Sequence, residues 1–178
     1  MGLIVGPDSS DLERYAADEL VRYLRQLFQI GAAPTFERPN EAEVLLLIGA
    51  PETNPAIAEA LGDAGWPKLS DQGVVLKRTQ LNETPALVIG GGSPVATLWA
   101  VYTLAEHWGV RFLQAGDIFP AAPPPFSLTE TDTVMEPTFR ARWYKTMGDF
   151  AMGMEGWGMA DYRPFIDQLA KMKFNRIR

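Results

Sequence analysis

Three carboxylates in the last third of the chain have the chemistry of an acid–base catalyst. Asp149 and Glu155 lie in the glycine- and methionine-rich stretch from Gly148 to Gly158, and Asp161 follows it. Glycoside hydrolysis uses two carboxyl groups, and in barrel enzymes these lie in loops after parallel strands. The simpler interpretation is that Asp149 and Glu155 are solvated loop acids and that Asp161 caps a helix. We assign no catalytic residue in this chain and keep Asp149 as a candidate for substrate binding.

An arginine and a tryptophan close to this stretch have side chains suited to sugar recognition. Arg142 alternates with apolar residues in a predicted strand from Phe139 to Thr146. An inward-facing guanidinium is costly there unless an anionic or polyhydroxylic ligand uses it. Trp157, like Trp143, can stack on a sugar ring. Arg142 and Trp157 are therefore candidates for substrate binding, and the alternatives are an arginine at a domain interface and tryptophans that anchor a core or loop.

The glycine run Gly90-Gly91-Gly92-Ser93 lies between a predicted strand and the start of a predicted helix. Backbone N–H groups at such a position can bind phosphate. The run matches neither the dinucleotide-binding fingerprint nor the phosphate loop that ends in Gly-Lys-Ser/Thr. A tight turn that needs small residues is the favoured interpretation, and nucleotide or phosphate binding stays an alternative.

Composition excludes several classes of chemistry and partner. The chain has no cysteine and a single histidine, His107, so we expect neither a metal site nor a cofactor. A net charge of -6 without a block of Lys and Arg argues against nucleic acid. The longest apolar run, Val44 to Ile48, is far shorter than the roughly 20 residues of a membrane span. No secretion signal begins the chain, which fits a cytoplasmic protein or a secreted one whose signal has been removed.

The first two thirds of the sequence predict an α/β domain. Ser10 and Glu13 form a capping box, and the helix that they begin has Gly31 as its expected stop. Ser93 and Pro94 begin a second helix that ends at Gly109. Strands are predicted at residues 3–5, 43–48, 73–78 and 86–89, with one short helix within 51–61. The expected fold is a two-layer α/β sandwich, a mixed sheet with its two main helices on one face.

The last third predicts a separate unit. Four prolines between Pro120 and Phe126 indicate a stiff linker. A strand, a helix capped by Asp161 and the start of another strand follow it, and they are too few to enclose a core. We therefore predict an N-terminal domain at residues 1–119, a linker at 120–136 and an incomplete unit at 137–178 that belongs to something longer.

Several segments together resemble the N-terminal, non-catalytic α/β domain of glycoside hydrolases such as family 20 β-hexosaminidases, family 67 α-glucuronidases and family 89 α-N-acetylglucosaminidases. The residues that carry the resemblance are Ala16–Leu20 with Tyr23-Leu24, Leu47-Ile48-Gly49, Gly73–Leu76, Val88–Gly92, Ala96–Leu104 and Trp108–Leu113. Pro137–Arg142 is similar to the start of the (β/α)8 catalytic barrel, and Tyr162–Arg178 to its first helix and second strand. Arg142 falls on the position of an arginine that binds sugar hydroxyls in family 20.

The resemblance implies an N-terminal fragment of a glycoside hydrolase that acts on a terminal sugar, either an N-acetylhexosamine or a uronic acid, with a role in carbohydrate metabolism. This part would support the TIM barrel and be inactive alone, because the catalytic carboxylates would lie beyond Arg178. The expected partner is a carbohydrate substrate bound by the full-length barrel. Two alternatives remain: a stand-alone carbohydrate-binding or protein-interaction module, and a nucleotide- or phosphate-binding domain that uses Gly90–Ser93.

Overall fold

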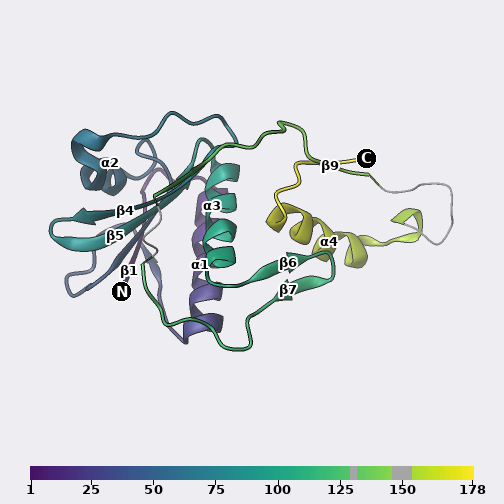
Figure 1. The fold of residues 1–178 in the computed structure, drawn as a ribbon, viewed down its shortest axis with the longest axis horizontal. Coiled ribbons are helices and arrows are strands. Elements are labelled where there is room, and N and C mark those ends of the chain that lie inside the picture. The colour runs from purple at the N-terminus through teal and green to yellow at the C-terminus, as the bar shows by residue number, and fades with distance from the viewer. Residues whose placement is uncertain (129–131, 146–153) are drawn as a thin grey trace.

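A six-stranded mixed sheet lies at one end of the computed structural model, which describes residues 1–128, 132–145 and 154–178 (Figure 1). The strand order is β2-β1-β3-β5-β4-β8. The strands are β1 (Gly2–Val5), β2 (Pro34–Thr35), β3 (Leu45–Ile48), β4 (Val74–Leu81), β5 (Thr84–Gly91) and β8 (Thr133–Met135). β2, β1, β3 and β5 run parallel, and β4 is antiparallel to both of its neighbours. The predicted mixed sheet is confirmed.

Helices cover both faces of this sheet, the two long ones on the same face. Alternate strand residues, among them Leu3, Leu46 and Ile89, pack with α1 (Asp11–Phe28) and α3 (Pro94–His107). The intervening residues of the same strands pack with the short helix α2 (Pro55–Leu61), which continues into the 3-10 turn η1 (Gly62–Ala64). The apolar runs of β1, β3 and β5 are continuous because both faces of these strands are buried.

α1 begins where the sequence predicts but ends earlier than predicted. Ser10 Oγ accepts the N–H of Glu13 at 3.3 Å, and Glu13 Oε2 accepts the N–H of Ser10 at 2.8 Å, so the predicted capping box is present. The predicted stop at Gly31 is wrong. The chain leaves the helix at Gln29, which has a left-handed φ of 58° and donates its N–H to Arg25 O at 3.0 Å.

Two strand segments follow α3, and one of them joins the sheet. A hairpin of β6 (Arg111–Leu113) and β7 (Gly116–Ile118) extends from the end of α3 and lies beside α4 (Figure 1). β8 lies within the segment 120–136 that the sequence predicts as a linker, yet it pairs with the edge of β4, with Val74 opposite Met135. Residues 133–135 are therefore part of the sheet.

The C-terminal part is a strand–helix–strand unit, as predicted. β9 (Trp143–Tyr144) and β10 (Arg176–Ile177) pair in parallel on either side of α4 (Met159–Lys171), and the 3-10 turn η2 (Met154–Gly156) precedes α4. β9 is shorter than the predicted strand at 139–146. α4 packs against α3 and the β6–β7 hairpin, with Phe165 and Leu169 buried. None of the helices in the described ranges has the length and hydropathy needed to cross a membrane.

Candidate functional site

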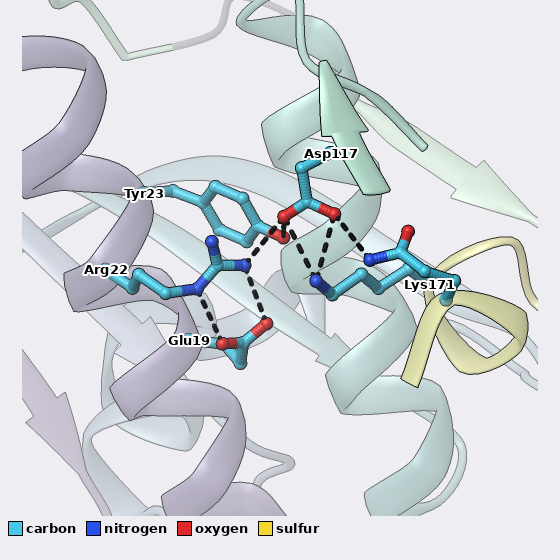
Figure 2. A network of polar contacts seen from close by, with 6 residues as sticks. Glu19, Arg22, Tyr23, Asp117 and Lys171 are labelled. Atoms are coloured by element: carbon cyan, nitrogen blue, oxygen red, sulfur yellow. Dashed lines mark hydrogen bonds and ion pairs between the residues drawn. The ribbon is translucent and has the colours of Figure 1, made fainter. Parts of the chain in front are cut away.

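A buried polar cluster around Asp117 attaches α4 to the N-terminal domain (Figure 2). Asp117 lies on β7, and its carboxylate accepts hydrogen bonds from Lys171 Nζ at 2.9 and 3.0 Å and from Gln168 Nε2 at 3.0 Å. The Asp117 side chain is 8% exposed and that of Lys171 is 10% exposed. A second ion pair, between Lys173 Nζ and Glu106 Oε2 at 2.6 Å, joins the turn after α4 to α3.

α1 supplies the other side of the Asp117 cluster. Arg22 Nη2 and the Tyr23 hydroxyl donate to Asp117 Oδ2 at 3.0 and 3.1 Å. Arg22 also donates two hydrogen bonds to Glu19, from Nε to Oε1 at 2.8 Å and from Nη2 to Oε2 at 3.0 Å. Its guanidinium carbon lies 4.1 Å from the centroid of the Tyr23 ring. The carboxylates of Asp117 and Glu19 thus face the cations of Arg22 and Lys171. Three elements far apart in sequence, α1, β7 and α4, meet at the Asp117 carboxylate (Figure 2).

The electrostatics of this cluster favour an ionised Asp117. Burial opposes ionisation, but the hydrogen bonds from Lys171 and Gln168 outweigh it and hold the pKa of Asp117 below its ordinary value. Burial raises the pKa of the Tyr23 hydroxyl, so Tyr23 is a neutral donor to the carboxylate. A carboxylate surrounded by donors has little basicity. The cluster is therefore suited to holding α4 in place and not to proton transfer.

Arg142 lies where the C-terminal unit meets α3. Its Nε donates to Lys173 O at 2.6 Å, and its Nη1 donates to Gln72 Oε1 at 2.7 Å and to Phe139 O at 3.0 Å. The guanidinium carbon is 4.7 Å from the ring centroid of Trp99. Partial burial lowers the pKa of Arg142 from its ordinary value. Arg142 thus lies at an interface between two parts of the chain, which is one of the two alternatives that the sequence leaves open for it. Sugar binding by Arg142 stays a prediction.

The remaining sequence candidates fall in different places. Trp157 is half-buried and packs edge-on against Tyr162 and Phe165. It lines a cleft of about 410 Å³ together with Asp161 and the hairpin residue Gln114. Asp161 Oδ2 accepts the N–H of Gly158 at 2.9 Å, which is a role at a helix N-terminus. Glu155 is exposed in η2. Asp149 lies outside the described residues. The structure thus places Trp157 and Asp161 at one cleft and Arg142 against α3.

The glycine run forms the predicted tight turn. A Cβ on Gly90 would lie 2.0 Å from Gly49 O, and one on Gly92 would lie 1.8 Å from Ser70 O. The amide groups that a phosphate would need are already used, because Gly92 N donates to Gly73 O at 3.0 Å and Ser93 Oγ accepts the N–H of Ala96 at 3.2 Å. The contacts of this loop therefore give no support to the phosphate-binding alternative.

The single histidine lies at the surface. His107 is exposed in the last turn of α3, where a cation suits the helix dipole. Within residues 1–128, 132–145 and 154–178, His, Cys, Asp and Glu form no group of three that could hold a metal ion.

No signal in the sequence points to the Asp117 cluster. Asp117 and Lys171 are 54 residues apart. Asp117 resembles an ordinary turn acid, and Lys171 resembles an ordinary cation in the last turn of a helix. Only the packing of α4 on the β6–β7 hairpin turns them into partners.

Comparison with known proteins defines the family of the chain. The family model described as the N-terminus of glycosyl hydrolase family 67 matches residues 3–104, from β1 into α3. The chain therefore belongs to this family of glycoside hydrolase N-terminal domains, in agreement with the resemblance found in the sequence.

A solved structure extends the likeness in fold to the whole chain. It is a family GH115 4-O-methyl-α-glucuronidase with specificity for decorated arabinogalactans. The two share a TM-score of 0.68 and 13% identity over 99% of this chain. This chain spans 25% of the length of that enzyme chain. None of the curated proteins matches this sequence.

Proposed function

We propose that this chain is the N-terminal part of a glycoside hydrolase, in which the α/β domain supports a (β/α)8 catalytic barrel that begins near residue 137. The observation that carries the proposal is the parallel β9–α4–β10 unit, held to a family 67 N-terminal domain through the buried Asp117. A strand, a helix and a parallel strand are the repeating unit of such a barrel. The proposed role is in carbohydrate metabolism.

The exposed surface of the C-terminal unit supports this proposal. A two-stranded parallel pair is not stable by itself and leaves both of its edges open. Trp143 on β9 and Ile177 on β10 are 46% and 44% exposed. Further strands and helices of a barrel would cover these side chains and pair with these edges.

The substrate that we propose is a glycoside with a terminal uronic acid. The family 67 domain and the fold shared with a glucuronidase favour a uronic acid over an N-acetylhexosamine, the other terminal sugar that the resemblance admits. The carboxylates that act as acid and base would come from later barrel strands. The 178-residue chain would contribute the supporting domain and the first barrel unit.

The test compares this chain with a longer product of the same reading frame. A barrel needs roughly 200 further residues with alternating strands and helices. The longer protein should release uronic acid from an aldouronic acid substrate, and the 178-residue chain should release none. Release of uronic acid by the shorter chain would contradict the proposal, and so would a longer protein that folds but cleaves no glycoside.

A further inference from the structure

A cleft of about 330 Å³ lies at the carboxyl edge of the sheet, away from the Asp117 cluster and from Trp157. It is bounded by the first turn of α1, the loops after β3 and β5, and the segment that leads to β4. The side chains that give it its chemistry are Glu13, Glu52, Thr53, Trp66 and Ser93. A cleft of this volume is within the range of small-molecule sites.

The topology of the sheet explains why a cleft opens at this edge. After β3 the chain turns to α2 on one face of the sheet, whereas after β1 and β5 it turns to α1 and α3 on the other face. Loops that diverge in this way leave a crevice outside the carboxyl ends of parallel strands, and ligands of α/β proteins bind in such crevices.

Close backbone contacts lie directly beside the cleft, because Gly49 and Gly90 are the chain neighbours of the lining residues Ala50 and Gly91. Gly90 approaches Gly49 O so closely that a Cβ would lie 2.0 Å from it, and the ring edge of Trp66 would be 2.9 Å from the same Cβ. Gly49 has a φ of +121°, and Thr53 Oγ1 occupies the space beside it. The cleft is therefore formed before any ligand binds, which lowers the entropic cost of binding.

Glu13 presents an oriented carboxylate at the base of the cleft. The residue is 2% exposed. Its Oε2 accepts from the N–H and the hydroxyl of Ser10, both at 2.8 Å, and its Oε1 accepts from Thr53 Oγ1 at 2.8 Å. A carboxylate has about four acceptor sites, so three hydrogen bonds leave Glu13 able to accept another. The exposed Glu52 adds a second carboxylate at the rim.

The charge of the lining selects the class of ligand. It contains two carboxylates and no Lys, Arg or His, so it repels phosphate, sulfate and uronate. The half-buried indole of Trp66 offers an apolar surface beside these acceptors. Acceptors next to an aromatic surface suit a neutral ring that carries several hydroxyl donors. We propose that this cleft binds one neutral pyranose unit of a saccharide, and this proposal does not depend on the barrel or on its activity.

Titration of the 178-residue chain by NMR tests the proposal, with D-xylose and D-galactose as neutral probes. One of these sugars should shift the Trp66 indole N–H and the backbone amides of Thr53 and Gly92 saturably, with a dissociation constant on the order of millimolar. Sodium glucuronate and phosphate should leave these signals unchanged. Saturable binding of phosphate, glucuronate or methylammonium at the same amides, or no saturation by either neutral sugar, would overturn the proposal.

Single substitutions test whether the neutral sugar binds in this cleft. Trp66→Ala and Glu52→Ala should each weaken sugar binding about tenfold or more. Glu41→Ala is the matched control, because Glu41 is an exposed acid that lies before β3 and outside the lining of the cleft, and it should leave the affinity unchanged. If Trp66→Ala loses its dispersed spectrum, Glu52→Ala decides, because Glu52 is exposed. Undiminished binding by Glu52→Ala, or an equal loss in Glu41→Ala, would contradict the assignment.

Discussion

Asp117 and Lys171 form an ion pair with 2.9 Å between Oδ1 and Nζ, although 54 residues separate them in the chain. Both side chains are almost fully buried. Removing one partner of a buried pair leaves the other as an uncompensated charge, which costs more than the pair itself contributes. This pair is therefore the contact at which the attachment of α4 to the N-terminal domain is most sensitive to substitution.

We predict that Asp117→Asn destabilises the protein by roughly 3 kcal/mol. The substitution keeps the shape of the side chain but leaves Lys171 and Arg22 without their shared anion. Urea unfolding gives the change in free energy, and amide hydrogen exchange should show α4 losing protection first. Asp63→Asn, at an exposed acid in η1, is the control and should stay within about 0.5 kcal/mol. A loss below about 1 kcal/mol for Asp117→Asn would contradict this account.

Protonation of Asp117 should contribute to the loss of folding stability at acid pH. Its pKa in the folded protein is below the ordinary value of 3.8, so the unfolded chain binds the proton more readily. The stabilisation is therefore complete above about pH 5 and is lost as the pH falls through 3.8 to the folded pKa. Urea midpoints measured down this range should drop more steeply for the wild type than for Asp117→Asn. Parallel curves for the two proteins would rule out this contribution.

Glu136 is the control for this pH dependence. Its pKa is also lowered, by hydrogen bonds from the hydroxyl and the backbone N–H of Ser70, but it is a solvent-exposed group. Solvent screens such contacts, so Glu136→Gln should change the acid limb of the stability curve less than Asp117→Asn does.

Elements with local signals could be predicted from the sequence. The Ser10–Glu13 capping box placed the start of α1, and Ser93 with Pro94 placed that of α3. The apolar run of β3 indicated burial on both faces. These signals lie within a few residues of the element that they specify, so no tertiary information was needed.

Features that depend on distant partners could not be predicted. β8 is a three-residue strand in a segment rich in prolines, and only the edge of β4 makes it a strand. The left-handed Gln29 ends α1 although Gly31 is the better local signal. The placement of Arg142 depends on Trp99 and Gln72, which lie far from it in the chain. The sequence therefore identified candidate side chains but not the contacts that decide their roles.

Arg142→Ala should reduce the free energy of unfolding by about 1–3 kcal/mol, because it removes charged hydrogen bonds and the cation–π contact with Trp99. Arg140→Ala is the matched control. The Arg140 side chain is 85% exposed and lies 3.6 Å from Asp71, so its loss should cost less than about 1 kcal/mol. Thermal and urea unfolding of both variants measure the difference. Equal losses would show that the interface contacts of Arg142 contribute nothing particular.

The proposal that Arg142 also binds sugar makes a separate prediction for the longer enzyme. Arg142→Ala should then cost about 2–4 kcal/mol in kcat/KM, more than its effect on folding explains, and Arg140→Ala should cost less. Near-wild-type kcat/KM in folded Arg142→Ala would leave this residue with the interface role alone.

Gly92→Ala should destabilise the turn between β5 and α3. The added Cβ would lie 1.8 Å from the backbone oxygen of Ser70, so one of the two segments must move, which costs about 1–3 kcal/mol. Gly31→Ala is the matched control: no atom lies within 4 Å of the added Cβ, so it should be neutral or stabilise by up to about 1 kcal/mol. Urea unfolding of both variants measures the two effects. If the run also bound phosphate, phosphate would raise the unfolding midpoint of the wild type, and Gly92→Ala would abolish that rise. We expect phosphate to leave the unfolding midpoint of the wild type unchanged, because the amide of Gly92 already donates to Gly73 O.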